Sequence, residues 1–97
     1  MAIYLVFINW TEQGIRSVKD SPKRLDAARK TIKEMGGELK TFYMTQGKYD
    51  AVLIIEMPSD EKLASFVLKI GAVGNVRTTT LRAYSEDDYR KIIGGLG

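Results

Sequence analysis

The chain has 97 residues, with 15 Lys and Arg against 12 Asp and Glu, and it contains neither Cys nor His. This length fits one domain of ordinary size, and the missing residue types exclude disulfides, thiol nucleophiles and every site that needs histidine. What remains is carboxylate, Tyr, Lys, Arg and Ser/Thr chemistry, or binding without chemistry. The net charge of +3 is mild for a nucleic-acid-binding protein.

The sequence has no signal for a membrane or a secretory pathway. No apolar run approaches the roughly 18 residues of a membrane span, and the first residues lack the basic region and cleavage site of a signal peptide. We therefore expect a cytoplasmic protein. Because the chain lacks Cys and His, we also expect it to use neither a metal nor a cofactor.

The beginning of the chain predicts a strand followed by a short helical turn. Residues 3–8 form an unbroken apolar run, mostly β-branched or aromatic, which is typical of a strand buried on both faces. Residues 11–18 follow, with Thr11 as a helix cap and with Ile15 and Val18 expected to point inward.

A longer helix is expected next. Ser21 and Pro22 supply an N-cap and a proline at the first helical position. Gly36 and Gly37 end this helix, because glycine adopts the left-handed conformation at low cost. Its buried stripe consists of Leu25, Ala28, Ile32 and Met35.

The middle of the chain predicts a β-hairpin and a second long helix. Residues 39–45 and 49–57 are the two strands, joined by a tight connection around Gly47. The helix begins at residues 58–61, where acidic side chains favour the positive end of the helix dipole, and Gly71 ends it. Its buried stripe consists of Leu63, Phe66, Val67 and Ile70.

The last part of the chain predicts a fourth strand at residues 75–84 and a terminal helix at residues 85–96. Ser85 and Asp88 have the spacing of a capping box at the start of this helix. The apolar side of the helix is expected to comprise Tyr89, Ile92, Ile93 and Leu96.

The element order β-α-β-β-α-β, with an extra C-terminal helix, predicts the topology. Right-handed crossovers place it in an α+β, ferredoxin-like antiparallel sheet with strand order 4-1-3-2. Residues 1–97 then form a single domain in which both long helices cover one face of the sheet. The other face stays open.

The open face is expected to be apolar, because the first and third strands carry apolar residues on both sides. A patch of this size marks an interface. The terminal helix covers part of it, or a second copy packs sheet against sheet to give a dimeric α/β barrel. We favour the homodimer.

The same topology gathers the unusual polar and aromatic residues at one edge of the sheet. Together with the helix that begins at Ser21, they suit a small anionic or carbonyl ligand. A purely structural role is also open to each: a packed lid for Trp10, hairpin hydrogen bonds for Asp50, solvated surface for the cations. The candidate ligand-binding residues are Asn9, Trp10, Arg16, Arg24, Tyr49, Asp50, Asn75, Arg77 and Arg82.

Alternation along the fourth strand decides where Arg82 points. It shares a face with Thr78 and Thr80, while Leu81 and Ala83 lie on the other face. We expect the apolar pair to meet the helices and Arg82 to face the open side, beside the carboxylates of the third strand. A carboxylate and an arginine in a partly apolar cleft have shifted pKa values, although a structural ion-pair network does the same.

Four segments are distinctive when they occur in this order: Trp10-Thr11-x-Gln13-Gly14, Asp20-Ser21-Pro22-Lys23-Arg24, Gly47-x-Tyr49-Asp50 and Gly74-Asn75-Val76-Arg77-Thr78-Thr79-Thr80-Leu81-Arg82-Ala83. They resemble the GYD domain family of small bacterial and archaeal proteins, named for a glycine-tyrosine-aspartate motif that Lys48 interrupts here. The resemblance covers nearly the whole chain. It implies a ferredoxin-like fold of the dimeric α/β-barrel type and does not supply a function.

Three functions remain open at this point. The first is a small-molecule-binding or regulatory module without chemistry. The second is a cofactor-independent enzyme similar to the dimeric α/β-barrel monooxygenases, with Asp50, Glu56 or a tyrosine replacing histidine in proton transfer. The third is RNA binding, which residues 48–51 fit least because they lack a second stacking aromatic. A structural or assembly role is the remaining alternative.

Overall fold

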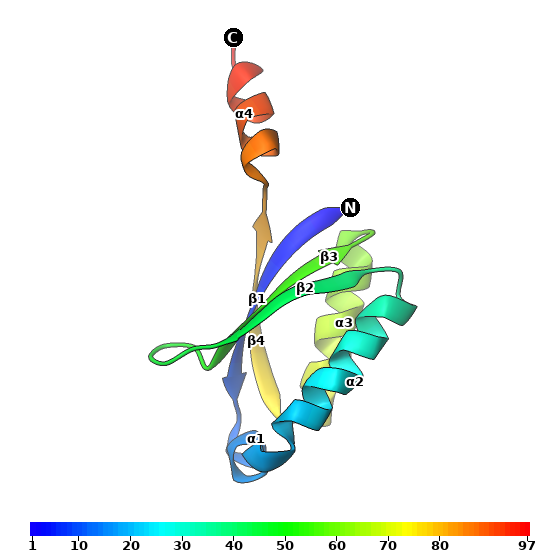
Figure 1. Cartoon of the computed structure of the whole chain (residues 1–97), viewed down its shortest axis with the longest axis vertical. Helices are drawn as coiled ribbons and strands as arrows, with labels where there is room; N and C mark the ends of the chain where they lie inside the picture. Colours follow the sequence, from blue (N-terminus) through cyan, green and yellow to red (C-terminus); the bar gives the residue numbers. More distant parts are fainter.

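The computed structural model describes residues 1–97 and contains one four-stranded antiparallel sheet (Figure 1). Its strands are β1 (Ala2–Trp10), β2 (Glu38–Met44), β3 (Ala51–Met57) and β4 (Val76–Ala83). They lie in the order β2-β3-β1-β4, which is the predicted order 4-1-3-2. The α+β, ferredoxin-like fold is confirmed.

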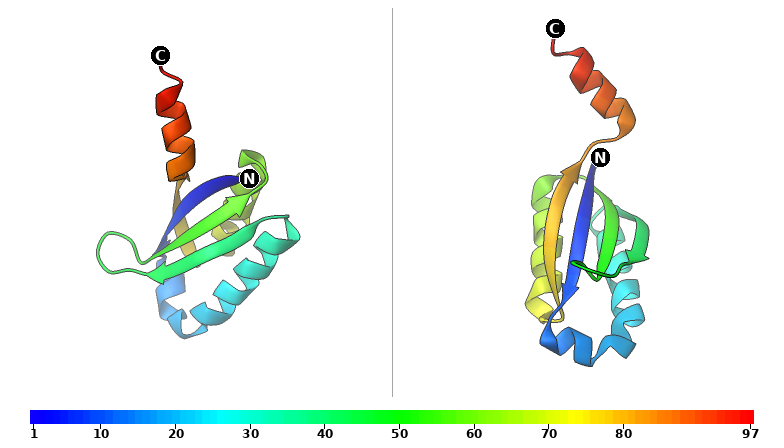
Figure 2. Two further views of the ribbon diagram at one scale, coloured as in Figure 1. Left: turned by 45° about the horizontal axis from the view of Figure 1, so that its top comes forward. Right: turned by 90° about the vertical axis from the view of Figure 1, so that its left-hand side faces the viewer.

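The two long helices, α2 (Ser21–Glu34) and α3 (Asp60–Val73), lie on one face of the sheet (Figures 1 and 2). The short helix α1 (Glu12–Arg16) and the 3₁₀ turn η1 (Val18–Asp20) connect β1 to α2. A fourth helix, α4 (Glu86–Gly94), follows β4. The opposite face of the sheet carries no helix.

The hydrophobic core lies between the sheet and the two long helices. Alternate side chains of β1 and β3 are buried, because successive residues of a strand point to opposite faces. Ile32 of α2 and Phe66 of α3 are fully buried against them. The complete core is Tyr4, Val6, Ile8, Ile32, Ala51, Leu53, Ile55, Met57, Leu63 and Phe66.

Side-chain caps begin three of the four helices. At α1, α3 and α4 the hydroxyl oxygen of Thr11, Ser59 or Ser85 accepts a hydrogen bond from a backbone N–H three residues later. Helix α2 differs, since Asp20 occupies its cap position without a side-chain bond and Ser21 is its first residue. The predicted Ser21 cap is therefore wrong by one position.

Helix α3 continues past its predicted end at Gly71 and stops at Val73. The residue that closes it is Gly74, whose φ of 96° is left-handed and whose N–H donates to the Gly71 carbonyl at 3.0 Å. A glycine inside a helix costs only about 1 kcal/mol, which the burial of the apolar side of α3 outweighs.

Strand β4 presents its faces in the opposite sense to the prediction. Arg82 lies directly across from Tyr4, and Thr80 from Val6, and directly opposed residues share a face. Since Tyr4 and Val6 face the helices, Arg82 does too, and it does not join the carboxylates of β3. Leu81 instead lies on the open side, where it is 50% exposed.

Two apolar segments are more exposed than expected. Ile15 on α1 is exposed and does not point inward, although Val18 is half-buried. Helix α4 extends beyond the end of the sheet, and none of its residues is buried (Figures 1 and 2). The terminal helix therefore does not cover the open side of its own sheet.

The uncovered side of the sheet is apolar, as predicted. We call it the open face, defined by Ile3, Leu5, Phe7, Val52, Ile54 and Leu81. The β1–β3 and β1–β4 registers place these side chains next to one another. Its centre contains no charged residue.

Tyr4 links the sheet to the start of α3. Its ring is 3% exposed, and its hydroxyl donates a hydrogen bond to the Asp60 carboxylate. Burial raises the pKa of Tyr4 to about 12, and the hydrogen bond to Asp60 acts in the same direction. The neutral phenol is thus the form that the fold stabilises.

We predict that Tyr4 makes the folded state sensitive to alkaline pH. Because its folded pKa of about 12 exceeds the ordinary value of 10.0, the unfolded chain loses this proton first. The stabilisation is complete below pH 10 and is lost as pH rises toward 12, up to roughly 3 kcal/mol. Urea unfolding of Tyr4→Phe between about pH 8 and 11.5 should show a flatter decline than wild type. The exposed Tyr43→Phe is the control, and parallel curves for wild type and Tyr4→Phe would refute the raised pKa.

Candidate functional site

The edge of the sheet that the sequence singled out is built where β1 ends and β4 begins. We call it the rim, defined as residues 9–14, 45–50 and 74–77. The Thr11 backbone N–H donates to the Asn75 carbonyl at 3.1 Å, and the Thr11 hydroxyl donates to the Gly74 carbonyl at 2.5 Å. These bonds join the segment after β1 to the start of β4.

Asn9 and Asp50 hold the hairpin connection against β1. The Asn9 side-chain amide donates to the Lys48 carbonyl at 2.8 Å. The Asp50 carboxylate accepts a hydrogen bond from the Trp10 backbone N–H at 2.9 Å. Both polar side chains therefore have structural partners within the rim.

Tyr49 and Arg77 lie on the open-face side of the rim. The Tyr49 ring is 4.6 Å from the Phe7 ring between centroids, with an interplanar angle of 33°. Arg77 is exposed and lies directly across from Asn9 in the β1–β4 register. These two predicted residues extend the open face toward the rim.

Arg16 and Arg24 differ in what they contact. Arg16 pairs with Glu12 at 3.0 Å, with both side chains about three-quarters exposed, and such a surface pair contributes little. Arg24 donates to the Ser17 carbonyl at 3.0 Å and to the Gly14 carbonyl at 3.4 Å. Arg24 thereby ties the end of α1 to the start of α2.

Arg82 lies at the opposite end of the sheet and does not join the rim. Its guanidinium carbon is 4.4 Å from the centre of the Tyr84 ring and 5.7 Å from that of Tyr4. It also donates to the carbonyls of Ile3 and Ala83. These contacts fix the end of β4 against the start of β1.

Beneath the rim, a cavity of about 680 Å³ lies between the sheet, α2 and α3. We call it the inter-helix cavity. It brings together three of the nine predicted residues, Trp10, Arg24 and Asn75. Besides Trp10, its apolar lining consists of Ile8, Val18, Pro22, Leu25, Ala27, Ala28, Phe42, Met44, Ala51, Leu53, Ile70, Val73 and Val76.

The cavity opens to solvent next to the end of β2. Met44 lies across from the buried Ala51 and therefore turns toward the helices, yet it is 67% exposed. The polar groups of the cavity are few: Ser21, Arg24, Thr31, Lys69 and Asn75. Apolar walls with sparse polar groups are typical of a site for a small molecule.

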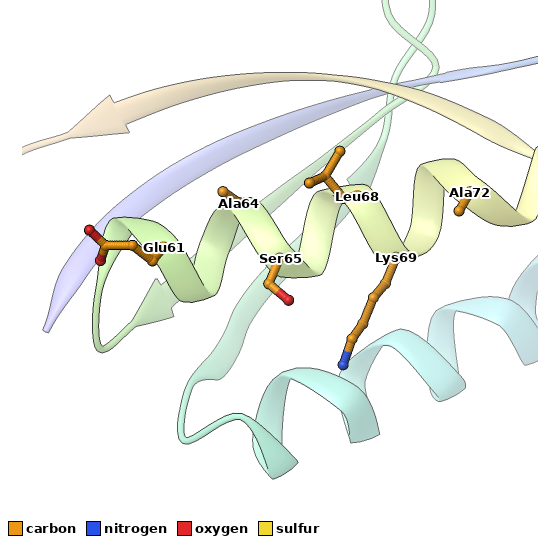
Figure 3. A pocket seen from close by; sticks show the side chains of 6 residues that line it. All are labelled: Glu61, Ala64, Ser65, Leu68, Lys69 and Ala72. Atoms are coloured by element: carbon orange, nitrogen blue, oxygen red, sulfur yellow. The ribbon is translucent and has the colours of Figure 1, made fainter.

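A second hollow lies on the outer side of α3 (Figure 3). All of its lining residues come from this one helix, including the exposed Leu68 between Ala64 and Ala72. Figure 3 shows Lys69 extending away from Leu68 toward α2, and Lys69 also lines the inter-helix cavity. Because a single helix cannot enclose a ligand, the inter-helix cavity is the candidate site.

Two further properties of the chain are negative findings. No group of three or more Asp or Glu side chains lies close enough together to hold a metal ion. No helix is both long and apolar enough to cross a membrane.

Sequence reasoning located the rim but missed the cavity beneath it. Three small residues are among those that line the cavity, Ala27 and Ala28 on α2 and Ala51 on β3, and its walls come from both long helices. The small residues were the only signal in the sequence, and the separation of two helices cannot be obtained from apolar spacing.

Comparison with known proteins assigns the family and the fold. The family model of the GYD domain matches residues 4–93. No curated protein matches the chain in sequence.

Several solved structures share the fold. MtbAldR superposes with a TM-score of 0.69 at 17% identity, over 88% of this chain and 52% of its own. A feast or famine regulatory protein from M. tuberculosis, complexed with L-methionine, gives a TM-score of 0.66 at 22% identity, over 89% of this chain and 54% of its own. TTHA0845 from Thermus thermophilus gives a TM-score of 0.56 at 25% identity, over 88% of this chain and 95% of its own. The chain spans about half the length of the first two proteins.

We predict that the rim tolerates no side chain at Gly14. A Cβ atom there would lie 1.9 Å from the Asn75 carbonyl oxygen, so Gly14→Ala must push α1 away from β4. Overpacking of this kind costs about 1–3 kcal/mol, measurable by urea unfolding. Gly71→Ala is the matched control, because no atom lies within 4 Å of the Cβ that an alanine would add there and a helical alanine gains up to about 1 kcal/mol. Equal stability of Gly14→Ala and wild type would contradict the close packing.

Proposed function

The chain belongs to the GYD domain family, and we propose that it is a small-molecule-binding regulatory module that assembles with a second copy of itself. In this proposal the ligand occupies the inter-helix cavity, and the open face is the surface through which the copies associate.

The observation that carries the ligand proposal is the inter-helix cavity. Ligand pockets typically have volumes of about 300–1,000 Å³ and apolar walls with a few polar groups, and the cavity has about 680 Å³. At its mouth, Met44 is 67% exposed. An apolar ligand that covers this side chain gains about 25 cal/mol for each Å² removed from water.

The polar groups of the cavity support a ligand with an anionic or carbonyl group. The Arg24 guanidinium has five N–H donors, and its bonds to the Ser17 and Gly14 carbonyls hold it in place. Donors that these bonds leave free suit a carboxylate, with Lys69 and Asn75 also lining the cavity. An apolar molecule with one carboxylate or carbonyl therefore fits both parts of the site.

A structural neighbour provides a probe for this chemistry. The feast or famine regulatory protein from M. tuberculosis was crystallised with L-methionine, which combines an apolar side chain with a carboxylate. Its 22% identity to this chain shows the fold alone. We propose a ligand of the same general kind, without assigning that amino acid.

The other six predicted residues lie outside the cavity: Asn9, Arg16, Tyr49, Asp50, Arg77 and Arg82. A part for them in ligand binding stays a prediction. A substitution of the exposed Arg77 distinguishes binding at the rim from binding in the inter-helix cavity, because it should weaken a ligand at the rim and leave a ligand in the cavity unaffected.

We predict that hexanoate and L-methionine bind the cavity and that 1-hexanol binds less tightly than hexanoate. A hydrogen bond to a charged group contributes about 1.5–3 kcal/mol, so Arg24→Gln should weaken hexanoate binding roughly 10-fold to 100-fold. Ala28→Phe should abolish binding by filling the cavity. Isothermal titration calorimetry measures each affinity.

The controls are Arg29→Gln, an exposed arginine on the same helix, and Arg77→Ala on the rim. Both should bind hexanoate as wild type does. Thermal unfolding checks that Arg24→Gln remains folded, since Arg24 also has structural bonds. Unchanged hexanoate binding by Ala28→Phe would overturn the cavity proposal, and loss of binding in Arg77→Ala would favour the rim.

The open face supports association between copies. Its apolar side chains would remain in contact with water in a single chain, and a large uncovered apolar patch marks an interaction surface. A twofold axis would bring the open faces of two copies together, so that the same surface of each copy forms the interface.

We predict that Leu5→Asp disrupts this association. Leu5 lies at the centre of the open face, opposite Ile54 and Leu81, so the new carboxylate would be buried without a partner. Sedimentation velocity should show at least about a 100-fold rise in the dimer dissociation constant. Lys30→Asp on the exposed side of α2 is the control and should not change it. Equal association of Leu5→Asp and wild type would contradict a sheet-to-sheet dimer.

A further inference from the structure

Helix α4 and the segment before it project beyond the rest of the chain. Figures 1 and 2 show α4 continuing past the end of β4, clear of the sheet and of α2 and α3. None of its residues is buried. The longest dimension of the molecule is 52 Å, against 31 and 18 Å for the other two, and the figures show that α4 forms the far end of this long axis.

One side of α4 is apolar. Ile92 and Ile93 lie three and four residues after Tyr89, which places all three side chains on a single side of the helix. Leu96, also exposed, lies two residues beyond its end at Gly94, so the terminal helix is shorter than the predicted 85–96. Ile92 and Ile93 are each 49% exposed. A helix of this pattern in a folded protein packs its apolar side against another surface.

Helix α4 also needs a packing partner for its own stability. It has nine residues, and isolated helices shorter than about 12–15 residues are only marginally stable in water. Its Ser85 cap and the exposed Arg90–Glu86 pair at 2.9 Å contribute a small part of what is required. Contacts with a further surface must supply the remainder.

The proposed association surface reaches the base of α4. Leu81 belongs to the open face, and Ala83, two residues later, points to the same side of β4. Ala83 is the last residue of β4, and α4 begins three residues later at Glu86. The surface through which we propose two copies to associate therefore ends next to the start of α4.

The contact area gives a second reason to involve α4. Four strands about 4.8 Å apart, each with about seven residues at about 3.4 Å, cover a flat area of roughly 450 Å², and protruding side chains make the accessible surface of the face larger than this. A standard interface buries about 800 Å² of accessible surface on each partner. The apolar side of α4 adds area to the contact beyond what the sheet supplies.

We infer that α4 is an exchanged arm: in the homodimer, the apolar side of α4 from each copy packs on the other copy rather than on its own domain. This inference rests on the sheet-to-sheet association under the proposed function. A twofold axis makes the exchange reciprocal, so that both arms are covered at once.

Arg82 has a role in this arrangement. It stacks at 4.4 Å on Tyr84, the first residue after β4, and donates to the carbonyl of Ile3 on β1 at 3.4 Å. These contacts hold the base of the arm in the outward direction before association. An arm that is already oriented loses less conformational freedom when it binds.

The first experiment separates the arm from the open face. In Ile92→Asp/Ile93→Asp both apolar side chains are replaced, and we expect at least about a 100-fold rise in the dimer dissociation constant by sedimentation velocity. Lys91→Asp, on the polar side of the same helix, is the matched control and should associate as wild type does. Because α4 is outside the core, circular dichroism and thermal unfolding should show that each variant keeps its fold.

The second experiment detects the contact between copies directly. The chain has no cysteine, so Lys91→Cys provides a single position for a nitroxide label. Lys91→Cys that carries the nitroxide and no ¹⁵N is mixed with ¹⁵N-labelled wild type. We expect line broadening in the spectrum of the ¹⁵N-labelled copy, because exchange packs the labelled arm of the other copy directly on it.

The outcomes distinguish the two proposals. If Leu5→Asp dissociates the dimer while the arm variant does not, and no broadening between copies is seen, the sheet-to-sheet dimer stands and the exchanged arm is wrong. If wild type is monomeric, or neither Leu5→Asp nor the arm variant changes association, both the dimer and the arm are overturned. Weaker association of the arm variant together with broadening supports the exchange.

Discussion

The structure depends on one constraint: its two central strands are apolar on both faces, and the helices of the chain cover only one face of the sheet. Tyr4, Val6 and Ile8 of β1 are buried under α2 and α3, while Leu5 and Phe7 between them point the other way. Burial of the first set gives the monomer its core. The second set gives the monomer a surface that water solvates poorly. The open face and the proposed association both follow from this division.

The rim shows how polar residues at the edge of such a sheet are used. Backbone groups are left without partners where strands end, and side chains of the rim bind them: Asp50 accepts from the Trp10 N–H, and Thr11 donates to the Gly74 carbonyl. A cluster of polar residues at a sheet edge is therefore a sign of loop closure as much as of ligand binding. In this chain, the geometry that suits a ligand lies under the rim, where small side chains are among those that line the inter-helix cavity.

The sequence predicted those parts of the fold that depend on residues close together in the chain. Apolar spacing predicted the strands, the two long helices and their order, because burial imposes a period of two or 3.6 residues on the sequence. The faces of β4 were predicted wrongly, since the threonine run at 78–80 contains no apolar alternation and the β1 register decides which residues turn inward. The end of α3 was misplaced because Gly71 and Gly74 look alike in the sequence, and only the backbone shows which has a positive φ.

The inter-helix cavity and the open face lie on the two sides of the same strands, so the ligand binding and the association that we propose share these strands. Leu53 lines the cavity, while its neighbour Ile54 belongs to the open face. A ligand that binds the associated and dissociated forms with different affinity shifts the association equilibrium by that difference, and association changes ligand affinity by the same factor. Close packing makes such a coupling physically direct, because a change in the position of β3 alters both surfaces together.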